Sequence, residues 1–226
     1  MFWDENKWGQ SNITSPVENY LEWKKNKETQ ETGFVMYSKE FEQEVMIDLK
    51  TFVVIDEAYQ IRGYNSKLKA YVKSNIISKK KEEEFIVLHE GQELYKGIYD
   101  PELKPQWATL YRVLTVNFEG KLTRLILKPS ASKAYIYSFV KEFDDKWNPT
   151  EWMDYDTRYK FFVEMTGTEK KESSFGDYVV PKFKVGKKLT EKDIKETTEL
   201  ANSFKEYISH FKENKDAETE SLEGSK

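Results

Sequence analysis

The side chains that most often carry catalysis are scarce in this chain. It has no cysteine, and neither of its two histidines, His89 and His210, has a second histidine three or four residues away. Cysteine chemistry and a zinc site of the HExxH type are therefore excluded, and no serine stands in a G-x-S-x-G motif. The segment 186–188 lacks the Ser or Thr that follows the lysine of a P-loop. The sequence predicts a protein that is not an enzyme and needs no cofactor.

One acidic group keeps a catalytic alternative open. Four aspartates flank two tryptophans in the segment 144–156, and paired carboxylates of this kind hold the metal ions of two-metal nucleases. Carboxylates in a loop-like segment are more often simply solvated, so no metal site is assigned and a metal-dependent nuclease stays an alternative. The aspartates are Asp144, Asp145, Asp154 and Asp156.

Two long windows, 61–81 and 120–141, contain basic and aromatic residues but no carboxylate, although the formal net charge of the chain is −4. Lysine and arginine neutralise phosphates, and aromatic rings stack on unpaired bases. Because bases are unpaired only in single strands, the mixture favours single-stranded over duplex nucleic acid, with DNA or RNA left open. The predicted phosphate contacts are Arg62, Lys67, Lys69, Lys73, Lys79, Lys80, Arg124 and Lys128. The predicted stacking residues are Tyr64, Tyr71, Tyr135, Tyr137 and Trp107.

The C-terminal residues 213–226 form a polar, net acidic segment that is expected to be disordered. Such a segment can compete with nucleic acid for a basic surface or dock onto basic replication or recombination proteins. A role in solubility alone is the alternative. Its acidic residues include Asp216, Glu218, Glu220 and Glu223.

The elements that must position these residues are mainly short strands. The clearest signal is a hairpin, in which the β-rich runs 109–118 and 121–128 flank Glu119-Gly120. Pro181 makes its strand an edge strand. Residues 131–143 are interpreted as a helix, although residues 135–137 could equally form a strand. One amphipathic helix follows over 190–212, where Thr190 and Asp193 form a capping box. This pattern predicts a small barrel or sandwich. The other expected strands are 34–37, 44–47, 52–63, 85–88, 158–166 and 178–185.

The chain divides by composition into four parts. Residues 1–33 form a Trp-containing arm that is expected to be partly flexible, with a short helix opening at Ser15. Residues 34–189 form the binding domain, and the helix 190–212 and the tail 213–226 follow it. No signal peptide or bilayer-spanning run is visible, and the lack of cysteine suits a reducing compartment, so we expect a cytoplasmic protein without a membrane partner.

The central 60% of the chain resembles the single-stranded DNA-binding proteins of tailed phages. The resemblance runs over residues 53–185 through VVIDEAYQIRGYN, FIVLHEG, the KGIY turn at 96–99 and ATLYRVLTVNFEGKLTRLIL, which leads into KPSASKAYIYSFV. It implies an OB-like five-stranded barrel with inserted hairpins and an acidic, flexible C-terminus. The long helix, the Trp-containing arm and the lack of a C-terminal aromatic residue depart from that family.

The resemblance also implies a function. Such a protein coats and protects single-stranded DNA during phage replication or recombination, without catalysis and largely without sequence preference, in the host cytoplasm. A virion structural or assembly protein, whose basic windows meet an acidic neighbour, is the alternative besides the nuclease. The oligomeric state is left open.

Overall fold

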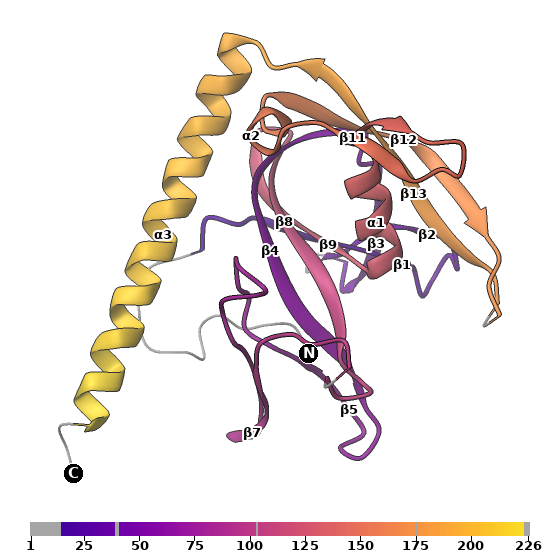
Figure 1. Cartoon of the computed structure of the whole chain (residues 1–226). Helices are drawn as coiled ribbons and strands as arrows, with labels where there is room; N and C mark the ends of the chain where they lie inside the picture. The colour runs from indigo at the N-terminus through magenta and orange to yellow at the C-terminus, as the bar shows by residue number, and fades with distance from the viewer. Residues whose placement is uncertain (1–14, 39–40, 103, 175, 224–226) are drawn as a thin grey trace.

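The computed structural model describes residues 15–38, 41–102, 104–174 and 176–223, with side chains described as far as residue 209. The prediction of a mainly β protein with a C-terminal helix is confirmed (Figure 1). No described helix combines the length and the apolar character that crossing a membrane requires. The strands are β1 Asn19–Lys25, β2 Thr32–Ser38, β3 Gln43–Ile47, β4 Thr51–Asn65, β5 Ala70–Lys73, β6 Phe85–His89, β7 Gln92–Gly97, β8 Thr109–Phe118, β9 Lys121–Leu127, β10 Val140–Phe143, β11 Pro149–Trp152, β12 Phe161–Lys171 and β13 Tyr178–Lys188. The helices are α1 Pro129–Tyr137, α2 Tyr155–Arg158 and α3 Glu191–Glu223.

One large mixed sheet organises the molecule. Its nine strands include the path β13-β12-β4-β8-β9-β1-β2-β3, and β5 pairs with the far end of β4. The pairing of β1 with β9 is parallel and the others are antiparallel. Among the described residues no pairing joins β13 to β3, so the sheet is open and does not form the predicted OB-like five-stranded barrel. Two small hairpins, β6-β7 and β10-β11, stand outside the sheet.

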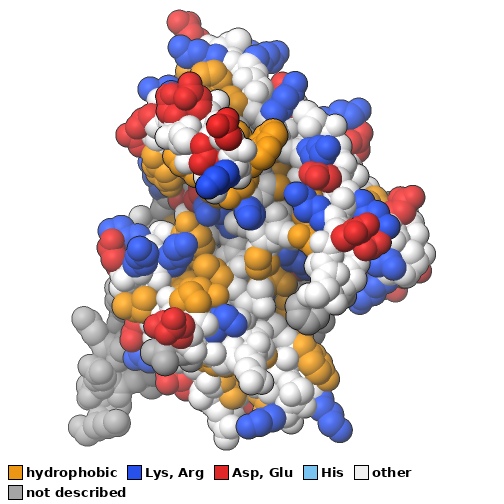
Figure 2. Space-filling model, turned by 45° about the vertical axis from the view of Figure 1, so that its right-hand side comes forward, with side chains coloured by type: hydrophobic (Ala, Val, Ile, Leu, Met, Phe, Trp, Pro, Cys, Tyr) orange, Lys and Arg blue, Asp and Glu red, His pale blue; other side chains and the backbone are white. Residues whose placement is uncertain are grey.

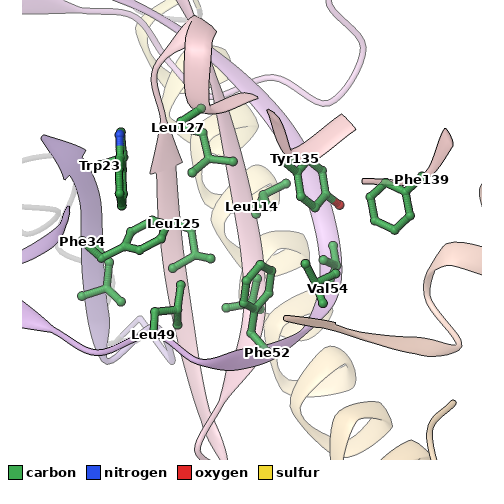
Figure 3. Close-up of a cluster of buried hydrophobic side chains, with 14 residues drawn as sticks. Trp23, Phe34, Leu49, Phe52, Val54, Leu114, Leu125, Leu127, Tyr135 and Phe139 are labelled. Carbon is green, nitrogen blue, oxygen red and sulfur yellow. The ribbon is translucent and has the colours of Figure 1, made fainter. Parts of the chain in front are cut away.

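The sheet curls instead of closing, and helix α1 fills the inside of the curl (Figure 1). The indole Nε1 of Trp23 on β1 donates to the carbonyl oxygen of Val179 on β13 at 3.2 Å, so strands from the two halves of the sheet meet across the interior. Tyr135 and Phe139 insert between those halves (Figure 3). A helix in this position supplies the apolar contacts that strand closure supplies in a barrel.

The main core consists of large rings and branched aliphatic side chains inside this curl (Figure 3). Trp23 and Phe34 meet edge to face, with ring centroids 5.2 Å apart. Tyr135 packs in the same way on Phe139 and Phe183, at 5.1 and 6.2 Å. A buried ring of this size removes roughly 150–250 Å² from water, so each contributes several kcal/mol to folding at about 25 cal/mol/Å².

Strand β9 is buried on both faces. Leu125 and Leu127 lie in the main core, whereas Leu122 packs with Phe204 of α3 in a separate small cluster. The turn that leads into β9 is the predicted two-residue turn, since Glu119 and Gly120 both have positive φ, 53° and 77°. The hairpin prediction is therefore confirmed.

The two ends of the chain differ from prediction. The segment expected to open a short helix forms β1 instead, inserted between β9 and β2, because Leu21 and Trp23 alternate toward the core. The capping box that starts α3 is confirmed, since Thr190 and Asp193 exchange backbone-to-side-chain hydrogen bonds. The helix then continues to Glu223 rather than ending at 212, since no Gly or Pro interrupts it before Gly224.

Candidate nucleic-acid interface

A small second core folds two loops onto β4. Ile61 of β4 packs with Ile77, Phe85 and Ala108, and Tyr59 exchanges two backbone hydrogen bonds with Ile77, at 2.7 and 3.0 Å. The loop before β8 also lies against β4, since a Cβ on Gly63 would be only 1.7 Å from the carbonyl oxygen of Trp107. These contacts fix residues 77 and 85 on one side, and residues 99, 107 and 108 on the other, against β4.

Between these loops and helix α1 lies a cleft of about 500 Å³. None of its lining residues carries a carboxylate. Figure 2 shows Lys and Arg side chains around a hollow between an upper and a lower part of the molecule. We name this site the basic cleft, and define it by four cations, Lys80, Lys104, Arg112 and Lys133, and three tyrosines, Tyr59, Tyr99 and Tyr137.

Arg112 holds the floor of the basic cleft in place. It forms an ion pair with the buried Glu57, and its Nε donates to Ser132 Oγ of α1 at 3.0 Å. Tyr135 donates its hydroxyl to the other oxygen of Glu57 at 2.8 Å. Burial, and then the neighbouring Glu57 charge, raises the pKa of Tyr135 well above its usual value. Arg112 is thus neutralised by Glu57, and the free charge of the cleft comes from its lysines.

The three lysines of the basic cleft, Lys80, Lys104 and Lys133, have no ion-pair partner in the described part of the chain. Two of them lie over tyrosine rings: Lys80 Nζ is 5.2 Å from the Tyr59 centroid, and Lys133 Nζ is 5.2 Å from that of Tyr137. Burial lowers the pKa of Lys80, and the nearby charges of Arg112 and Lys81 lower it further. An anion in the cleft would relieve this repulsion, so the site is suited to an anionic ligand with planar groups.

Two of the predicted contact residues line the basic cleft, Lys80 from the first window and Tyr137 from the second. Two other residues predicted to contact nucleic acid are too buried to reach it. Tyr135 is fully buried, because it faces the interior of the curled sheet and bonds Glu57. Arg124 is 7% exposed, because its guanidinium lies over the rings of Tyr20 of β1 and Phe204 of α3. The predictions for these two residues are wrong.

Other predicted contacts have partners within the protein. Arg62 donates to Gln60 Oε1 at 2.6 Å and lies over the Tyr111 ring. Lys79 forms an ion pair with Glu82 at 2.8 Å. Trp107 is half-buried in the second core. The half-buried Lys73 and Lys128 do not line the basic cleft, and their role as phosphate contacts stays a prediction.

The β4-β5 tip forms a separate basic surface, which we define as residues 64–71. Tyr64 and Tyr71 are a cross-strand pair, 57% and 56% exposed, and Lys67 and Lys69 are exposed in the turn between them. Because side chains alternate along a strand, Tyr64 lies on the opposite face of β4 from Tyr59, five residues earlier. The first window therefore does not form one continuous wall of a groove. Stacking by Tyr64 and Tyr71 stays a prediction.

Sequence reasoning missed most of the basic cleft. Tyr59 and Arg112 are paired across β4 and β8, so they project on one face, and a register assignment of that hairpin would have joined them. Lys104 and Tyr99 enter from a loop that no local pattern connects to β4. Lys133 lies in the second window but was not selected.

The acidic cluster has local structural roles. Asp144 accepts hydrogen bonds from the backbone nitrogens of Lys146 and Asn148, and Asp154 caps α2 by accepting from Thr157 N. Among the described residues no group of carboxylates or histidines is arranged to hold a metal ion. The predicted tail residues up to Glu223 continue the backbone of α3, while their side chains lie outside the described part.

Comparison with protein-family models, with curated proteins and with solved structures gives no match to this chain. The resemblance to phage single-stranded DNA-binding proteins therefore stays a prediction, and the function has to be argued from the basic cleft.

Proposed function

We propose that the protein binds single-stranded DNA without catalysis and that the basic cleft is its binding site. The observation that carries this proposal is the lining of the cleft, where three lysines without ion-pair partners among the described residues lie beside tyrosine rings and no lining residue carries a carboxylate. Lysines attract the phosphates of any polyanion, and rings add stacking worth about 1–3 kcal/mol per base. Only an unpaired base can reach those rings, so the site favours single strands over duplexes.

The dimensions support the same function. A cleft of about 500 Å³ lies in the size range of small-ligand pockets and suits a short piece of a strand rather than a duplex. The curled sheet supports the cleft on one side, as the barrel of an OB fold supports its binding surface, although the sheet is open. On the sequence resemblance alone, we extend the proposal to coating of DNA during phage replication or recombination in the host cytoplasm, with protein partners recruited by the acidic C-terminal segment.

The test is a titration of fluorescent oligo-dT at several salt concentrations. For single strands the slope of log affinity against log salt is about −0.7 per phosphate contact. The triple variant K80A/K104A/K133A should therefore show a slope less negative by about 2 and, at 0.1 M salt, roughly 100-fold weaker binding. The matched control K27A/K50A/K192A changes three exposed lysines that do not line the cleft, and it should bind like the wild type.

Three outcomes would contradict the proposal. Equal losses in the two triple variants would mean that general charge, not the cleft, attracts DNA. Salt-independent or very weak binding of the wild type would exclude a strand-binding role and favour the virion alternative. Cleavage of the oligonucleotide only when Mg²⁺ or Mn²⁺ is added would favour the nuclease.

A further inference from the structure

The molecule carries a second aromatic surface at the β10-β11 hairpin. Four exposed rings touch in series: Tyr137 lies 6.3 Å from Phe143 and 6.1 Å from Trp152, and Phe143 lies 5.7 Å from Trp147. Trp147 is 78% exposed at the turn. A monomer rarely exposes so many contiguous large rings without a partner. We therefore expect another molecule to cover this surface.

The charges around Phe143, Trp147 and Trp152, the three rings that do not line the basic cleft, argue against nucleic acid as that occupant. Two lysines in the segment, Lys141 and Lys146, are outnumbered by exposed carboxylates, and Lys141 is itself paired with one of them at 2.5 Å. A phosphate backbone would be repelled here, whereas a cationic surface would gain both ion pairs and cation–π contacts. We name these rings and carboxylates the acidic hairpin. Its carboxylates are Glu142, Asp144, Asp145, Glu151, Asp154 and Asp156.

A surface with complementary chemistry exists on the same chain. The β4-β5 tip exposes Lys67 and Lys69 with Tyr64, Tyr71 and the 39% exposed Leu68, in a stretch without any carboxylate. Figure 1 shows β5 at one end of the molecule and β11 at the other, so the two surfaces cannot meet within one chain. They can meet between two chains.

We propose that the acidic hairpin of one copy docks on the β4-β5 tip of a second copy. Because the two surfaces differ and lie at opposite ends, the contact is heterologous and repeats head to tail, which produces open chains of copies rather than a closed dimer. Two hairpins bury little area, so the contact is weak and transient in solution. Where the proposed function holds, neighbours on one strand have a raised effective concentration, and the same contact orders them along the DNA.

The experiment is sedimentation velocity of the full chain without nucleic acid, from about 10 μM to about 1 mM, the range of a weak contact. At low salt the average sedimentation coefficient should rise with concentration. At about 1 M salt, where the Debye length is about 3 Å, that rise should be strongly reduced. A failure here leaves the oligo-dT titration untouched, and a failure of that titration leaves this contact untouched, so the two proposals are separable.

Charge reversals test the pairing itself. E142K/D145K and K67E/K69E should each remain monomeric across the series. Two substitutions bring the net charge of the hairpin to zero and reverse that of the tip. An equimolar mixture should associate again, because the unchanged tip of the first variant meets the unchanged hairpin of the second. The control E28K/E31K makes the same charge change in the exposed β1-β2 turn and should associate like the wild type. A monomeric wild type at low salt, wild-type association of either reversed variant, or a monomeric mixture would overturn the proposal.

Discussion

The basic cleft and the acidic hairpin share a ring but differ in charge. Tyr137 lines the cleft on one side and contacts Phe143 and Trp152 of the hairpin on the other. In the cleft the rings stand among lysines without ion-pair partners in the described part of the chain, and around the hairpin they stand among carboxylates. Rings supply contact area to any partner, so the neighbouring charges decide whether that partner is a nucleic acid or a protein.

The largest effect should follow from making the cleft as acidic as the hairpin. The variant K80E/K104E/K133E replaces attraction with repulsion and should weaken oligo-dT binding by more than about 100-fold at 0.1 M salt. Fluorescence anisotropy measures the affinity, and circular dichroism checks that the sheet is retained. An affinity within tenfold of that of the wild type would show that the cleft is not the DNA-binding site.

Ring truncation distinguishes the cleft from the β4-β5 tip. Y137A should cost about 1–3 kcal/mol of binding to an oligonucleotide short enough for one copy, since one base loses its stacking partner. Y64A should leave that affinity unchanged, because its ring lies on the other face of β4. Y71A is a less clean control, because Tyr71 is hydrogen-bonded to Tyr111, which lines the cleft. If the tip variants lose affinity and Y137A does not, the sequence prediction of stacking at Tyr64 and Tyr71 is favoured over the cleft.

The loop wall of the cleft depends on Gly63. A Cβ at this position would lie 1.7 Å from the carbonyl oxygen of Trp107, so the loop before β8 must move away from β4. G63A should lower the free energy of unfolding by about 1–3 kcal/mol and should weaken oligo-dT binding, because Lys104 moves with the loop. Chemical denaturation and anisotropy measure the two effects. If G63A has the wild-type free energy of unfolding and the wild-type affinity, the close contact of Gly63 with Trp107 does not hold the loop in place.

The smallest effect concerns pH. The pKa of Lys80 is lowered by burial and by Arg112 and Lys81, so Lys80 loses its proton earlier than other lysines as the pH rises. Affinity for oligo-dT should therefore fall toward about pH 10, just below the ordinary lysine value. K80R stays charged, so the ratio of its affinity to that of the wild type should grow by up to about fivefold, the worth of one phosphate contact. A constant ratio would contradict the assigned position of Lys80.

Local patterns predicted much of the fold. Alternating runs gave most of the large sheet, the Glu119-Gly120 turn gave its central hairpin, and Thr190 with Asp193 gave the start of α3. The barrel was wrong because closure depends on how distant strand edges meet. Here α1 fills the space inside the curl, and nothing near 129–137 in sequence indicates that.

The two windows without carboxylates show why the site was only partly predictable. In 61–81 the pattern reflects an exposed basic surface, and Lys67 and Lys69 are exposed at the tip. In 120–141 it largely reflects burial, because β9 is covered on both faces and a carboxylate there would lose its hydration. Tyr135 was misassigned for that reason. Sequence alone cannot separate these two causes, since burial of β9 is decided by α1 and α3.

The position of DNA on the protein tests the central claim most directly. Oligonucleotides that contain bromodeoxyuridine can be photo-crosslinked to the full chain, and the modified residues can be identified by mass spectrometry. The account predicts crosslinks at Tyr59, Tyr99 or Tyr137, lost at high salt and absent with a duplex of the same sequence. Crosslinks confined to Tyr64 and Tyr71, or to Trp147, would contradict it.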